Sequence, residues 1–154
     1  MKKLLVVLMG LAILASASQA YVFGIETGFF TAGIPYMGFE LNDSQRIDVG
    51  LNYVSLNNAT TLNLVGRFQN KLVTAKKLSA YWAGGLGIAS AGNTSTITIS
   101  GVLGTEYMFD SNIGVYGDVN VLTLQSTSVG GASTTNFYLL QGSNIAVAGL
   151  RVYL

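Results

Sequence analysis

The last eleven residues, Asn144–Leu154, read NIAVAGLRVYL, and their chemistry changes from one residue to the next. Side chains alternate between the two faces of a β-strand, so an extended stretch with this sequence has two different faces. One face is purely apolar, and the other carries the charge of Arg151. The apolar face holds Ala146, Ala148, Leu150, Val152 and Leu154, and the opposite face holds Val147, Gly149, Arg151 and Tyr153. The pattern predicts a strand with an apolar medium on one side and a polar interior on the other.

Three positions of this strand follow a known spacing. Gly149, Val152 and Leu154 fit a glycine, two arbitrary residues, an apolar residue, any residue and a final apolar or aromatic one. The strand therefore resembles the C-terminal signature of bacterial outer-membrane β-barrels. In that family the chain usually ends on Phe or Trp, where this sequence has Leu154. The resemblance implies that the barrel-insertion machinery binds this strand and that the protein meets outer-membrane lipid.

The N-terminal segment has the pattern of a cleaved signal peptide. Lys2 and Lys3 precede an apolar run over 4–14, and Ser18-Gln19-Ala20 supplies small residues before a cut after Ala20. A membrane anchor would need about 18 consecutive apolar residues, and this run is shorter. We therefore predict a signal peptide over 1–20 and one domain over 21–154.

Composition excludes several classes of protein. Removing 1–20 leaves six Lys and Arg against seven acids, a net charge of 6 − 7 = −1. No basic patch suggests a nucleic-acid surface, and without cysteine there is no disulfide framework. Only 10% of residues are charged, yet the apolar residues after Ala20 sit at alternate positions and not in one long run. This distribution is typical of membrane-spanning strands, which need only about 9–11 residues each.

Period-two alternation predicts eight antiparallel strands, joined by tight turns at 42–44 and 110–112 and by longer connections at 70–78 and 123–143. With an even number of strands, both chain ends and the two shortest turns lie on the periplasmic side. The strands are expected over 21–29, 34–41, 46–53, 60–69, 79–89, 96–109, 113–122 and 144–154.

The whole of 21–154 thus resembles the small eight-stranded outer-membrane barrels, the group that includes OmpX, the OmpA membrane domain and the opacity-like proteins. This resemblance rests on pattern, and it implies an all-β, eight-stranded, antiparallel up-and-down transmembrane barrel in the bacterial outer membrane. A closed wall is favoured because an unpaired sheet edge in hydrocarbon is costly. No family motif assigns a functional residue.

The charged residues gather on the inward faces of the predicted strands. If 42–44 closes a hairpin, Glu40 falls opposite Arg46, and we expect an ion pair there. Arg67 and Arg151 are expected near the remaining inward acids, in a lumen that side chains nearly fill. The predicted network contains Glu26, Glu40, Arg46, Asp48, Arg67, Glu106, Asp118 and Arg151. It would close the lumen as a polar plug, or it would only satisfy interior polar groups.

Catalysis is not expected. The chain has neither His nor Cys, so the usual general base, thiol nucleophile and soft metal ligands are missing. We therefore predict no enzyme activity, no catalytic or metal site and no cofactor. The outer loops lack Lys and Arg, which makes them poor binders of polyanions.

The sequence thus favours an integral outer-membrane barrel with a structural or surface-interaction role. One alternative is a narrow channel or carrier for small apolar solutes. Another is a secreted soluble β-sandwich or barrel that binds a ligand, in which a protein core would cover Ile47, Val49, Leu51 and Tyr53.

Overall fold

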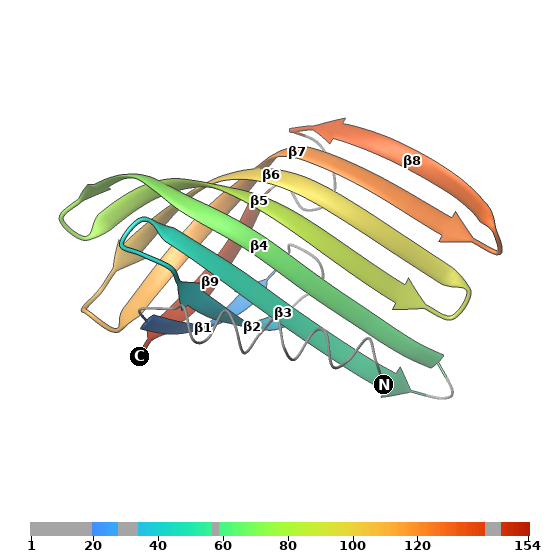
Figure 1. The fold of residues 1–154 in the computed structure, drawn as a ribbon, viewed down its shortest axis with the longest axis horizontal. Helices are drawn as coiled ribbons and strands as arrows, with labels where there is room; N and C mark the ends of the chain where they lie inside the picture. The colour runs from blue at the N-terminus through green and yellow to red at the C-terminus, as the bar shows by residue number, and fades with distance from the viewer. Residues whose placement is uncertain (1–19, 28–33, 57–58, 141–145) are drawn as a thin grey trace.

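The computed structural model describes residues 20–27, 34–56, 59–140 and 146–154 (Figure 1). The predicted signal peptide, except Ala20, lies outside these ranges. Within them the chain forms nine strands. They are β1 (Ala20–Thr27), β2 (Ile34–Glu40), β3 (Gln45–Leu56), β4 (Ala59–Ala75), β5 (Leu78–Ala91), β6 (Thr94–Met108), β7 (Ile113–Val129), β8 (Ala132–Leu139) and β9 (Ala146–Tyr153).

Antiparallel pairing follows chain order from β1 to β7, as expected for an up-and-down barrel. The last strand completes the circuit, because β9 pairs with β7 through Ile113↔Val152 and with β1 through Phe23↔Val152. Eight strands, β1 to β7 and β9, therefore surround one interior. The predicted all-β, antiparallel, up-and-down architecture is confirmed.

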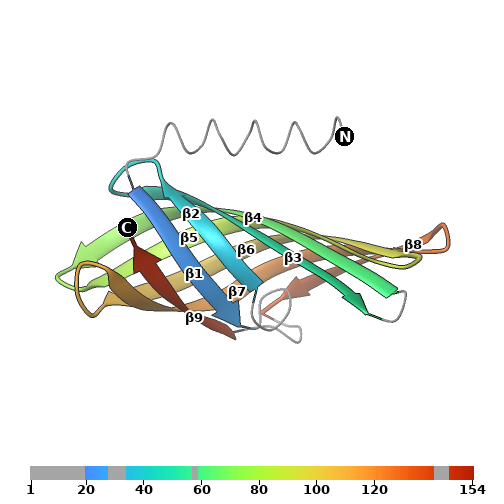
Figure 2. The same cartoon turned by 90° about the horizontal axis from the view of Figure 1, so that it is seen from below.

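The ring is complete only over the part of the wall that contains the short strands. Figure 2 shows β1, β2 and β9 beside the longer β3 to β7. In the described ranges, β8 pairs with β7 alone, and 51–56 of β3 pair with β4 alone. Within the described residues, the sheet is therefore open between β8 and the part of β3 formed by 51–56.

Both predicted tight turns are present and are closed by side chains. The Asn42 Oδ1 accepts hydrogen bonds from the backbone N–H groups of Ser44 and Gln45, each at 2.9 Å. Asp110 Oδ1 does the same for Asn112 and Ile113, at 2.7 and 2.8 Å. Short polar side chains mimic a backbone turn in this way. Asn42 and Asp110, which helped to predict the two turns from the sequence, are therefore the residues that close them.

The predicted connection at 70–78 was wrong, and most of the one predicted at 123–143 is paired strand. In place of the first, β4 continues to Ala75, and the turn is formed by Lys76 and Lys77. In place of most of the second, β7 continues to Val129 and β8 returns along it, with Gly130 and Gly131 at positive φ in the turn. The predicted eighth strand is β9, and β8 lies further along the same edge of β7.

Two bulges interrupt the period-two pattern. Leu72 is an extra residue of β4 between the pairs Lys71↔Tyr81 and Val73↔Ala80. Val121 is an extra residue of β7, because Gly101 pairs with Leu122 and Val102 with Asn120. A bulge reverses the faces beyond it, so beyond Val121 the even-numbered Leu122 and Leu124 of β7 are the exposed ones. In the described part of the chain, no helix is long and apolar enough to cross a membrane.

Candidate functional site

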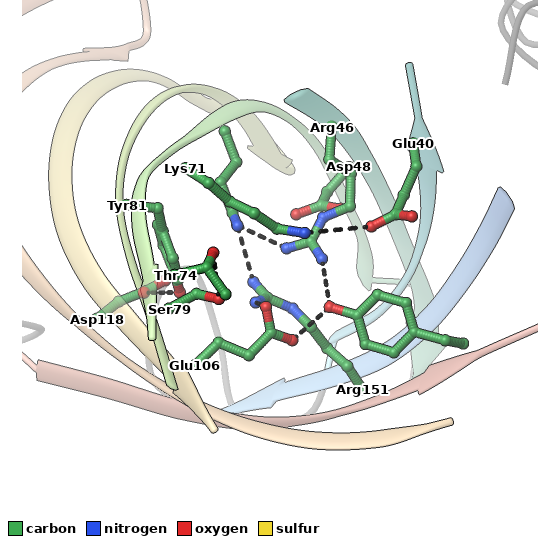
Figure 3. Close-up of polar contacts among 12 residues, drawn as sticks. Glu40, Arg46, Asp48, Lys71, Thr74, Ser79, Tyr81, Glu106, Asp118 and Arg151 are labelled. Carbon is green, nitrogen blue, oxygen red and sulfur yellow. Dashed lines mark hydrogen bonds and ion pairs between the residues drawn. The ribbon is translucent and has the colours of Figure 1, made fainter. Parts of the chain in front are cut away.

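Among the described side chains, six ionic ones occupy the interior of the ring, and we call them the interior ion cluster. They are Arg46, Asp48, Arg67, Glu106, Asp118 and Arg151, each at most 3% exposed. All six belong to the network predicted from the sequence. They come from β3, β4, β6, β7 and β9, so strands far apart in the chain meet through them (Figure 3).

Asp48 joins two arginines on one side of the cluster. Its Oδ1 lies 2.8 Å from Arg46 Nε, and its Oδ2 lies 2.9 Å from Arg67 Nη2. Arg67 continues the chain of ion pairs to Asp118, with Nη1 and Oδ2 at 2.8 Å. The hydroxyl of Tyr81 donates a short hydrogen bond to the other oxygen of Asp118. Each oxygen of Asp48 and of Asp118 therefore lies beside an arginine or a tyrosine hydroxyl.

Arg151 pairs with Glu106 on the other side of the interior, with Nη1 and Oε2 at 3.0 Å. The Arg151 Nε donates to the hydroxyl of Tyr36 at 2.8 Å, and its guanidinium carbon lies 3.8 Å from the ring centroid of Tyr116. Stacking on an aromatic face favours a desolvated guanidinium. Arg151 is 0% exposed, so these neighbours take the place of water around its guanidinium.

Two neutral side chains connect the halves of the cluster. Gln69 Oε1 accepts from Arg46 Nη2 at 2.5 Å and from Arg151 Nη2 at 3.2 Å. The Tyr153 hydroxyl accepts from Arg46 Nη1 at 3.0 Å and donates to Glu106 Oε1 at 2.5 Å. Among the described side chains, three arginines and three carboxylates therefore form one continuous, formally neutral network, in which each buried charge lies beside an opposite charge.

Two predicted members lie elsewhere. Glu40 pairs with Arg46 in the strand register, as the turn predicted, but the expected ion pair between them was wrong. Arg46 instead binds Asp48, two residues away on the same face, and Glu40 lies 3.9 Å from Lys71 in a partly exposed pair. The side chain of Glu26 lies outside the described part of the structure.

The tyrosines and the glutamine were not predicted as site residues. These side chains lie at inward-facing positions of their strands, and each ends in a polar group. The two properties together could have identified them from the sequence: Tyr36, Gln69, Tyr81, Tyr116 and Tyr153. Each is long enough to reach across a narrow lumen. A buried tyrosine usually finds a hydrogen-bond partner for its hydroxyl.

Gly149, one of the three residues of the C-terminal signature, also has a packing role. A Cβ atom placed on it would overlap the ring of Tyr116, which stacks on Arg151. Val152 is half-buried and pairs with Phe23 and Ile113, and Leu154 is exposed beyond the end of β9.

Replacing Gly149 by alanine is expected to destabilise the fold by about 1–3 kcal/mol, because the Tyr116 ring must move out of its contact with Arg151. Urea unfolding of the protein in lipid vesicles measures this. Gly84→Ala is the matched control, since a Cβ there meets nothing within 4 Å. Equal stability of the two variants would contradict the packing role of Gly149.

The strand pairings and the interior define a small antiparallel β-barrel with a buried, neutral ion cluster. No family model matches the sequence, and no curated protein matches it. Among solved structures, the crystal structure of Neisserial surface protein A is similar over 86% of this chain and 92% of that one, with 13% identity and a TM-score of 0.42. At this identity the likeness concerns fold alone.

Proposed function

We propose that the chain is an integral outer-membrane β-barrel with a structural or surface-interaction role, and that the interior ion cluster closes its lumen. The observation that carries the proposal is the separation of side chains across the wall. The six members of the ion cluster face inward and are buried, and most of the large apolar side chains, such as Leu86, Ile99 and Leu103, are exposed on the outward face. A soluble protein of this size would bury the second set and expose the first.

The outward band has the length that a bilayer requires. On β5 it runs from Leu78 to Ile88 and on β6 from Ile97 to Tyr107, which is 11 residues on each strand. The large apolar side chains within it are 40–50% exposed. Ser90 and Ser95 follow on the same face. Since a tilted strand crosses hydrocarbon in about 9–11 residues, the band supports a transmembrane wall.

Location is tested by fractionating the cell envelope and by running the extracted protein on a denaturing gel with and without boiling. We expect the protein in the outer-membrane fraction and a faster-migrating band before boiling, because a barrel stays folded in the detergent. A soluble protein without this shift would favour the secreted sandwich.

Closure of the lumen is tested by conductance in planar bilayers. Because the cluster spans the interior with direct contacts between its members, we expect a conductance no higher than that of other plugged eight-stranded barrels. Well-resolved larger conductance steps would favour the narrow channel instead.

Two further parts of the proposal come from the sequence. The absence of His and Cys supports a role without catalysis. The C-terminal signature, Gly149, Val152 and Leu154, supports binding to the barrel-insertion machinery.

A further inference from the structure

The cations of the mature chain fall into two groups. All three arginines belong to the interior ion cluster, and all three lysines, Lys71, Lys76 and Lys77, lie on the hairpin formed by β4 and β5. Lys71 faces the mouth of the lumen and pairs with Glu40. Lys76 and Lys77 form the turn itself and are exposed. In the described part of the chain, neither of these two ammonium groups lies within 4.0 Å of a carboxylate.

Apolar side chains surround this lysine turn. Leu72 and Val73 before it and Leu78 after it are at least 50% exposed. The bulge at Leu72 adds one more apolar residue to this end of β4 than regular pairing would. The turn therefore combines two uncompensated cations with an apolar surface that is continuous with the outward band of β5.

A backbone carbonyl beside an aromatic pair binds one of the lysines. Lys77 Nζ donates to the backbone carbonyl of Phe109 at 2.6 Å, and the Phe109 ring packs edge-on against Tyr107 at 5.6 Å. Both rings are more than 40% exposed. Aromatic rings beside lysines mark the level where hydrocarbon meets headgroups.

We propose that Lys76 and Lys77, with Leu72, Val73 and Leu78, form a binding site for an anionic phospholipid of the inner leaflet. The ammonium groups would bind the phosphate and the anionic headgroup, and an acyl chain would lie along Leu78 toward Trp82. The inference rests on the proposed function, because it requires the outward band to lie in a bilayer. Each lysine near a membrane surface contributes roughly a fivefold preference for negative lipid.

The other two turns at this end of the barrel carry acids and not lysines. Asp43 lies in the first and Asp110 in the last. Among the three turns at this end, positive charge is thus found on the β4–β5 turn alone. Its direct continuity with exposed apolar side chains favours a lipid over a soluble acidic partner, which would not need the apolar surface.

The single tryptophan makes the test direct. Trp82 lies on the outward face of β5, opposite Asn70 of β4, and packs against Phe68 with centroids 5.7 Å apart. Its fluorescence in vesicles of brominated phosphatidylcholine, brominated phosphatidylglycerol and their mixtures gives the relative affinity of the two lipids for this part of the wall. We expect a severalfold preference for phosphatidylglycerol that weakens at high salt.

The variant Lys76→Asn with Lys77→Gln should bring this preference close to one. Asn suits position 76, where φ is 54°. Asp43→Asn is the matched control, since it changes charge at the same end of the barrel but at another turn. It should keep the preference, whereas an opposite change about half as large in this control, which removes one charge against two, would show a net-charge effect and overturn the site.

The outcomes separate the two proposals. Strong quenching by both brominated lipids without a preference, or a preference that survives loss of both lysines, would overturn the lipid site and leave the membrane location intact. No quenching of Trp82 by either lipid would contradict the membrane location itself.

Discussion

Replacing Arg151 by methionine is expected to destabilise the folded barrel by about 3–5 kcal/mol, because the Glu106 carboxylate would remain buried without its cation. The methionine keeps much of the side-chain length, so the loss reports on charge and hydrogen bonds more than on volume. Arg151 also contacts Tyr36, Gln69 and the Tyr116 ring, and all three contacts would be lost together. Urea unfolding in lipid vesicles, followed through the heat-sensitive gel band, measures the effect.

Two further variants make the result specific. Adding Glu106→Gln to Arg151→Met should recover part of the loss, since the uncompensated carboxylate is then removed. Lys71→Met breaks the pair between Lys71 and Glu40, whose side chains are 25% and 19% exposed, respectively. Because this pair is partly exposed, its loss should lower the free energy of unfolding by no more than about 1 kcal/mol. If Arg151→Met were as mild as Lys71→Met, the ion cluster would not be holding the interior together.

Replacing Leu103 by arginine is expected to destabilise the barrel in lipid by about 2–4 kcal/mol. Leu103 is half-exposed on the outward face of β6, near the middle of its apolar band. A guanidinium there would have to leave water for hydrocarbon. Folding equilibria in vesicles measure the cost.

The matched control is Ser95→Arg, which lies on the same face of β6 beyond the band and should cost about 0–1 kcal/mol. In a water-soluble protein, a substitution at a half-exposed position such as Leu103 would change stability by only about 0.5 kcal/mol. Equal effects of the two arginines would therefore contradict a lipid-facing wall.

The sequence was most informative where one face of a strand differs from the other. For β9, every residue described between Ala146 and Tyr153 lies on the predicted face, with Val147 and Arg151 buried and Leu150 exposed. The register of Glu40 opposite Arg46 also followed from the turn. Parity places a side chain inside, but it does not choose among several carboxylates there, so the true partner of Arg46, Asp48, could not be named.

The β7–β8 hairpin shows where pattern reasoning fails. From Gln125 to Asn136 both faces are mainly Ser, Thr and Gly, so there is no apolar alternation to indicate a strand. The two strands are nevertheless paired through backbone hydrogen bonds, which leave no pattern in the side-chain sequence. The bulges at Leu72 and Val121 have the same character, because an extra residue in an apolar run looks like ordinary sequence.

The most direct test of the central claim is a scan of single-cysteine variants from Ile97 to Tyr107, which the absence of native cysteine makes straightforward. Each variant carries a spin label in vesicles, and its collisions with oxygen, enriched in lipid, are compared with those of a water-soluble nickel complex. We predict a period of two, with oxygen favoured at the odd, outward positions and most strongly near Leu103. Outward positions that favour the nickel complex along the whole strand would contradict the account.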